Sequence, residues 1–336
     1  MIGPKRNTLH AADAFPIDVV LTWVDGDDPR HKAKMSRFVT SDMQQEDDIA
    51  GTTRFKSVGE IFFCVASINK FAPWVRKIFV VTDEQNPHLE EFLSYNFPDG
   101  SIPVEIVDHK VIFRGYEQYL PTFNSISIET MTWRIPGLSE HYIEFNDDFI
   151  LAAPVLPRDF FPREGRVICY GKRYFMPVVR LTRLLKRHND GTRKVTFKET
   201  MINGAKLLGH SLSFIKIYHT PKPLLRSVYE EFFSKYPEAM MRNISHRFRS
   251  PSQFNSQEIM YLLLMESNRC KKLKAYTRLL YIKPRSLEHI KEKLQKFDGR
   301  PDYIFACFNS VDQTSLEGQR MIKDWLYKRI GIKPLP

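Results

Sequence analysis

The feature of this sequence that most constrains its fold is an alternation of strand-like and helical segments in its first half. The β-rich runs are residues 17–24, 77–83, 104–108 and 141–151. Apolar residues at helical spacing lie between them, over 58–70 and 125–133. Strands that alternate with helices in this way predict an α/β fold with a mainly parallel sheet.

Polar residues stand where several of these strands are expected to end. Asp25 and Asp83 each follow a strand, and Asn146 begins the triplet that continues with Asp147 and Asp148. Ligands of such sheets bind at the carboxyl ends of the strands, so we expect these side chains to meet at one site. Two carboxylates beside an amide suit Mg²⁺ or Mn²⁺. Neighbouring strand residues face opposite ways, which predicts that only one of the two aspartates points at a given ligand. Solvated turn acids are the alternative.

Charge divides the chain into two parts. Hydrophobic residues make up 43% and charged residues 26%, the balance of a globular protein, and the net charge is +11. Residues 156–250 hold 20 Lys and Arg against 7 Asp and Glu, which predicts an anionic partner. We therefore divide the chain into an α/β core over 17–155 and a basic, more helical region over 156–336. Helices are expected there at 222–235, 255–267 and 315–329.

Several classes of function lack their signature in this sequence. There is no phosphate-binding P-loop, no dinucleotide fingerprint, no kinase set and no zinc-finger or helix–turn–helix pattern. These absences disfavour NTPases, dehydrogenases and nucleic-acid binding. There is also no apolar leader, and the longest apolar run, 259–265, is far shorter than the roughly 20 residues of a membrane span. We expect a cytoplasmic protein, attached at most to a membrane surface.

Two further segments carry candidate chemistry. His219 ends a β-like run just before an X-Pro dipeptide, and a histidine titrates near neutrality, which suits a general base. Arg247 and Arg249 are two residues apart, and one of them could hold a phosphate through two hydrogen bonds. A surface histidine and a solvated basic face are the alternatives.

Motif blocks in a fixed order connect these segments. They are IDVVLTWVDGDDP (17–29), RFKSVGEIFFCVASINKFAPWVRKIFVVTDEQ (54–85), LPTFNSISIE (120–129) with YIEFNDDF (142–149), and HTPKPLLRSV (219–228) with YPE (236–238) and HRFRS (246–250). Together they resemble the Stealth family of bacterial capsular and exopolysaccharide hexose-1-phosphate transferases, relatives of the eukaryotic GlcNAc-1-phosphotransferase. The sequence departs from the family at Asn124, where Ser is usual, and at Ser310, where the family has Asp.

The resemblance implies a reaction and roles for particular residues. A sugar 1-phosphate would pass from a UDP-sugar to a hydroxyl of a capsular or exopolysaccharide acceptor, forming a phosphodiester and releasing UMP. The α/β core would be Rossmann-like, of the GT-A type that binds nucleotide sugars. His219 would be the general base, Arg249 would hold the transferring phosphate, and Asp147 and Asp148 would carry Mg²⁺ or Mn²⁺. The expected substrate-binding residues are Trp23, Asp25, Arg54, Glu60, Gln85, Thr122, Ser125, Asn146, Asn203 and Arg247.

Two alternatives stay open at this point. An ordinary GT-A-like glycosyltransferase suits an acidic strand end equally well. A non-enzymatic module that binds polyanions or a membrane surface would also explain the basic region. If the chain is instead the sugar-1-phosphate transferase that the resemblance implies, its expected partners are a UDP-sugar and an anionic polysaccharide that follows the basic surface. We then also expect peripheral contact with the inner membrane and no nucleic-acid partner.

Overall fold

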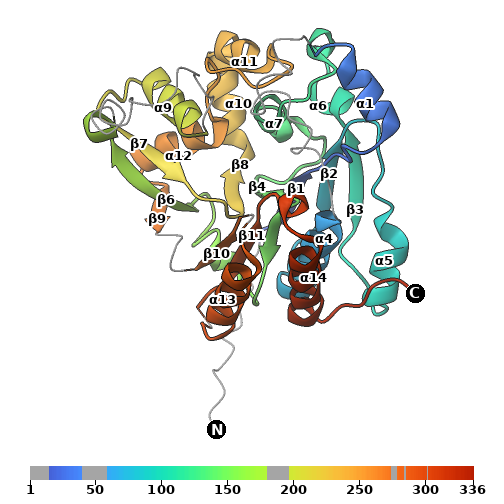
Figure 1. Ribbon diagram of the computed structural model, residues 1–336. Coiled ribbons are helices and arrows are strands. Elements are labelled where there is room, and N and C mark those ends of the chain that lie inside the picture. The colour runs from blue at the N-terminus through green and yellow to red at the C-terminus, as the bar shows by residue number, and fades with distance from the viewer. Residues whose placement is uncertain (1–14, 40–58, 180–196, 274–277, 284, 301) are drawn as a thin grey trace.

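The computed structural model describes residues 15–39, 59–179, 197–273, 278–283, 285–300 and 302–336 (Figure 1). Its main sheet has five strands in the order β3-β2-β1-β4-β8. The strands are β1 (Ile17–Thr22), β2 (Ile78–Thr82), β3 (Val104–Asp108), β4 (His141–Asn146) and β8 (Lys222–Leu225). The first four are mutually parallel, and β8 runs antiparallel to β4. The expected α/β class with a mainly parallel sheet is confirmed.

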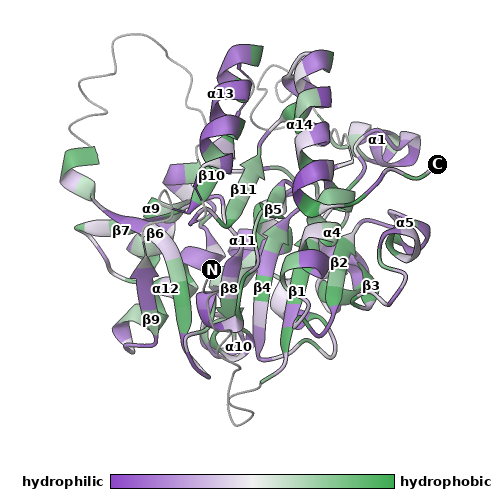
Figure 2. Cartoon of the chain, turned by 90° about the horizontal axis from the view of Figure 1, so that it is seen from below, coloured by the Kyte–Doolittle hydropathy of each residue, from purple (hydrophilic) through white to green (hydrophobic). Residues whose placement is uncertain are grey.

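The apolar strands of this sheet are buried in its centre. Every residue of β2 is buried, and so is every residue of β1 before Thr22. Such continuous apolar runs suit parallel strands that are covered on both faces. Helices α4 (Glu60–Phe71) and α14 (Leu316–Ile330) pack together on one side of the sheet (Figure 1). In Figure 2, β2 and β11 are largely in the hydrophobic colour, whereas α13 and α14 carry both hydrophobic and hydrophilic residues along their turns.

The other described strands form two smaller sheets of three strands each. One has the order β10-β11-β5 and consists of β5 (Phe149–Leu151), β10 (Leu279–Ile282) and β11 (Phe305–Phe308). The other has the order β7-β6-β9 and consists of β6 (Val167–Phe175), β7 (Ser213–Ile217) and β9 (Cys270–Leu273). The single strand expected over 141–151 is therefore wrong. It is divided into β4 and β5, which lie in different sheets, and Asp147 and Asp148 form the turn between them.

The expected helices are confirmed at three places and corrected at two. The remaining helices are α1 (Pro29–Ser36), α5 (Leu89–Asn96), α6 (His109–Ile112), α7 (Ser125–Glu129), α9 (Phe197–Leu207), α10 (Arg226–Lys235), α11 (Pro237–Ile244), α12 (Ser256–Glu266) and α13 (Leu287–Asp298). The patterns at 58–70, 255–267 and 315–329 correspond to α4, α12 and α14. The helix expected over 222–235 starts only at Arg226, because its first residues form β8. The helix expected over 125–133 ends at Glu129. Among the described residues, no helix is both long and apolar enough to cross a bilayer.

Candidate active site

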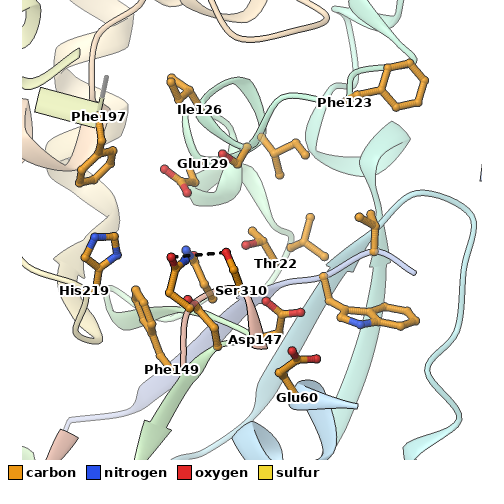
Figure 3. A pocket seen from close by; sticks show the side chains of 18 of the residues that line it. Thr22, Glu60, Phe123, Ile126, Glu129, Asp147, Phe149, Phe197, His219 and Ser310 are labelled. Carbon is orange, nitrogen blue, oxygen red and sulfur yellow. Dashed lines mark hydrogen bonds between the residues drawn. The ribbon is translucent and has the colours of Figure 1, made fainter. Parts of the chain in front are cut away.

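A cavity of about 610 Å³ opens at the carboxyl ends of β1 and β4 (Figure 3). Nine of the residues expected at the site line it: Trp23, Glu60, Thr122, Ser125, Asn146, Asp147, Asp148, His219 and Arg249. They come from four sequence blocks that are up to 226 residues apart. In Figure 3, His219 and Phe197 lie on one side of the cavity, and Asp147 and Glu60 lie on the other.

The turn after β4 presents both of its carboxylates to this cavity. Since Asp147 and Asp148 lie in a turn, the strand alternation that predicted a single inward aspartate does not apply. Asp148 Oδ2 accepts a hydrogen bond from Cys307 Sγ at 3.3 Å. Burial raises the pKa of Asp147 well above its ordinary value, and the charges of Asp148 and Glu60 raise it further. A cation placed here would relieve that repulsion.

The donor set fits a divalent metal that also binds substrate. Asn146 Oδ1 is buried and has no hydrogen-bond partner among the described residues. No group of three His, Cys, Asp or Glu side chains in the described ranges is arranged to hold an ion alone. Mg²⁺ typically takes one or two carboxylates and completes its shell with water and substrate phosphates, so Asp147 and Asp148 are sufficient in number and type.

His219 lies between β7 and β8 and is held by aromatic rings. Its imidazole stacks on Tyr281, with centroids 4.9 Å apart and planes 9° apart, and on Phe197 at 5.8 Å. Burial lowers the pKa of His219 to about 4, helped by the positive charges of Lys222, Lys283 and Lys216. At neutral pH the ring is therefore unprotonated and can accept a proton.

Arg249 reaches the cavity from the segment after α11. Its Nη2 donates to Ser125 Oγ at 2.9 Å, at the first turn of α7. Asn124 Nδ2 lies 2.9 Å from the carbonyl oxygens of His246 and Phe248, and so fastens the same segment to the start of α7. The blocks at 120–129 and 246–250 are thus joined, and the guanidinium faces the cavity from a fixed backbone.

The acids and amide expected after β1 and β2 stabilise loops and do not line the cavity. Asp25 N donates to Gln85 Oε1 at 2.8 Å, and Gln85 Nε2 donates to Asp25 O at 2.9 Å. The two residues therefore join the loops after β1 and β2. Asp83 pairs with Lys34 at 3.0 Å. Although burial opposes it, hydrogen bonds from His31 and Lys34 hold the pKa of Asp83 down to about 2.

Asn203 and Arg247 also bind backbone and do not line the cavity. Asn203 Nδ2 donates to the carbonyls of Pro251 and Gln253, both at 2.8 Å. Arg247 Nη2 donates to Leu120 O at 3.1 Å, and its guanidinium lies 4.3 Å from the centre of the Phe38 ring. Both side chains stabilise the segment that carries Arg249. Arg54 and the basic residues Arg180, Arg183, Lys186 and Arg187 lie outside the part of the chain that the structure describes.

Among the cavity residues that were not predicted as site residues, three carry titratable side chains of particular interest: Glu129, Lys222 and His109. Glu129 and Lys222 stand inside the motifs LPTFNSISIE and HTPKP, so the motifs themselves could have indicated them. His109 has no such signal. It is a buried lining residue, and its ring nitrogens have no hydrogen-bond partner among the described residues.

Sequence comparisons match the chain to one family. Stealth protein CR1, conserved region 1, matches residues 15–42, and Stealth protein CR2, conserved region 2, matches residues 54–168. A capsular polysaccharide phosphotransferase of Haemophilus influenzae is 36% identical over 246 residues, which cover 72% of this chain and 63% of the relative. An exopolysaccharide phosphotransferase of Streptomyces coelicolor is 34% identical, over 76% of this chain and 42% of the relative. A receptor polysaccharide phosphotransferase of Streptococcus oralis is 32% identical, over 71% and 75%.

The chain spans between 42% and 63% of the first three relatives that it matches. Among solved structures, mouse xyloside xylosyltransferase 1 is similar with a TM-score of 0.40 and 11% identity, over 88% of this chain and 98% of that one. The galactosyltransferase LgtC is similar with a TM-score of 0.42 and 10% identity, over 95% and 97%. Both of these similar proteins are named as glycosyltransferases.

Proposed function

The chain belongs to the Stealth family, and on that premise we propose that it transfers a sugar 1-phosphate from a UDP-sugar to a hydroxyl of a polysaccharide acceptor. The observation that carries the proposal is the cavity that brings His219, Arg249, Asp147 and Asp148 together from separate blocks. It thus holds a neutral base, a fixed cation and a pair of carboxylates, which are the groups that transfer from a diphosphate requires.

The proposed step is an in-line displacement at the β-phosphorus. The acceptor oxygen bonds to that phosphorus while the bond from it to the bridging oxygen breaks. The electron pair of the broken bond leaves on UMP, and the proton of the attacking hydroxyl goes to His219. The products are a phosphodiester between sugar and acceptor, UMP and a proton that His219 releases to water.

The chain's own residues position and neutralise the donor. Arg249 offers a rigid guanidinium to the transferring phosphate, with Ser125 fixing its orientation. Aromatic packing holds the His219 ring in one plane, so its proton-accepting nitrogen keeps a defined direction. Asp147 and Asp148 would hold Mg²⁺ or Mn²⁺, which would neutralise charge on the diphosphate when bound.

A donor labelled at its β-phosphate tests this proposal. Purified protein is incubated with a panel of UDP-sugars and a polysaccharide acceptor, and the label and the released nucleotide are followed. Sugar-1-phosphate transfer places the label in the polymer and releases UMP. Label recovered in UDP identifies an ordinary glycosyltransferase and overturns the proposal. Salt-sensitive acceptor binding with no nucleotide release across the panel identifies a non-enzymatic polyanion-binding module.

A further inference from the structure

Lys222 is a buried cation that faces the candidate active site. It is the first residue of β8, three positions after His219, and its side chain is about 5% exposed at the wall of the cavity. Its Nζ lies 3.8 Å from Glu144 Oε1 and 4.9 Å from the centre of the Phe149 ring. At 3.8 Å the contact with Glu144 is longer than a hydrogen bond, so the N–H donors of this ammonium can still bind a ligand.

The partner of Lys222 is fixed from behind by a buried network. Glu144 is fully buried on β4, and Gln257 Nε2 donates to Glu144 Oε1 and, at 2.9 Å, to Glu129 Oε2. Thr132 Oγ1 lies 3.4 Å from Glu144 Oε2. Burying an ion pair is costly, and its attraction repays that cost only when the geometry is good and further hydrogen bonds satisfy the groups. Burial and the neighbouring Glu129 raise the pKa of Glu144, which weakens its pairing with Lys222. The ammonium, at 3.8 Å from Glu144, is therefore available to a ligand.

The two Lys or Arg side chains among the described lining residues are Lys222 and Arg249. A nucleoside diphosphate sugar carries a negative charge on each of its two phosphates. Two basic side chains, one for each phosphate, would balance these two negative charges. Arg249 is fixed to Ser125, whereas Lys222 is a compact point charge whose N–H donors can follow oxygens that move during transfer.

We infer that Lys222 is a further catalytic residue, whose ammonium binds a diphosphate oxygen of the donor. This inference rests on the proposed function. Removal of Lys222 alone would leave Glu144 buried without its cation and could unfold the protein. The test therefore uses Lys222→Met combined with Glu144→Gln, alongside Glu144→Gln alone. Lys216→Met is the matched control, since Lys216 also lies near His219 but does not line the cavity.

The expected result is a fall in kcat of about 10²–10³-fold in the double variant, typical of losing one preorganised donor to developing charge. Glu144→Gln alone and Lys216→Met should each stay within about tenfold of the wild type in kcat, with all three proteins folded by circular dichroism. The acid limb of the pH–rate profile should move to higher pH in the double variant. The groups that face His219 are Lys216, Lys283 and Tyr281, and they are unchanged in it.

Two kinetic results would overturn the inference. One is a double variant that keeps kcat within about threefold of the wild type. The other is an equal loss in Glu144→Gln alone, which would assign the effect to the buried network. If no UDP-sugar yields UMP, calorimetric binding of UDP decides separately. Weaker UDP binding in the double variant but not in Lys216→Met supports the ammonium contact even though the transfer reaction fails, and unchanged UDP binding refutes it.

Discussion

Replacing Asn124 by alanine should destabilise the protein and lower its activity together. Asn124 is fully buried at the N-cap of α7, where its Oδ1 accepts from Ile126 N at 3.2 Å. Its Nδ2 lies 2.9 Å from three acceptors, the carbonyls of His246 and Phe248 and Gln253 Oε1. Its two N–H bonds can serve two of them at once. The family's usual serine could form the cap but could not donate to both carbonyls.

The size of the effect follows from these contacts. Loss of the cap costs about 1 kcal/mol. Loss of a net hydrogen bond costs about 1 kcal/mol, and a buried carbonyl left without a donor costs about 1–3 kcal/mol. The carbonyl of His246 keeps a donor in Ser127 Oγ, so chiefly that of Phe248 is left unsatisfied. We expect Asn124→Ala to lose about 3–5 kcal/mol and Asn124→Ser about 2–4 kcal/mol, because serine keeps the cap.

Urea unfolding and steady-state kinetics together measure this prediction. The urea midpoint should fall at an unchanged m-value, which identifies a change in stability. Because the same segment carries Arg249, kcat/KM for the donor should fall on the order of 10²-fold, the effect of roughly 1 Å of misplacement. Asn69→Ala is the matched control. Asn69 is also buried and bonds to backbone at Val65 and Ile102, away from the cavity, so it should lose stability but not kcat/KM. A loss below about 1 kcal/mol in Asn124→Ala, or equal kinetic damage in the control, would refute the reasoning.

Three further predictions concern the base, the metal and the acceptor. A base must be unprotonated to act, so a pKa of about 4 for His219 predicts that kcat/KM is constant from about pH 6 upward and falls near pH 4. An acid limb at about pH 6.5 would contradict the burial that lowers this pKa. EDTA should abolish transfer and Mg²⁺ or Mn²⁺ should restore it, and Asp148→Asn should lose activity that added metal does not recover. Activity that survives EDTA would exclude the metal role. The basic run to change by charge reversal consists of Arg180, Arg183, Lys186 and Arg187. The change should raise KM for long acceptors and leave KM for the UDP-sugar unaltered. An equal rise in both KM values would contradict the idea that the acceptor binds along this basic run.

Much of the fold could be predicted from the sequence because its signals are local. Alternating segments and apolar runs identified β1, β2 and β3, and helical spacing identified α4, α12 and α14. The prediction was wrong where a local pattern was compatible with two structures. Residues 222–225 extend the apolar pattern of α10, yet they pair with β4 as an antiparallel strand. Only the partner strand, which is about 80 residues earlier, decides between helix and strand at that place.

In the candidate site, too, the sequence predicted some features and only the tertiary structure decided others. The motif blocks indicated His219, Arg249, Asp147 and Asp148, and all four line the cavity. Their chemical roles stay predictions until the variants are measured. The motifs did not show where each polar side chain points. Asp25, Gln85, Asn203 and Arg247 stand in or beside the same blocks and contact neighbouring backbone or loops.

The sequence by itself determined the α/β class, the family and the residue types available for chemistry, because periodicity, turn residues and motif order are all read along the chain. The tertiary structure alone decided which of those residues share a cavity. Gln85 and Asn203 use their amides to join loops, whereas Lys222 meets Glu144 because β8 pairs with β4. Side-chain direction depends on contacts between distant segments, and a buried polar group goes wherever its hydrogen bonds and charge are satisfied.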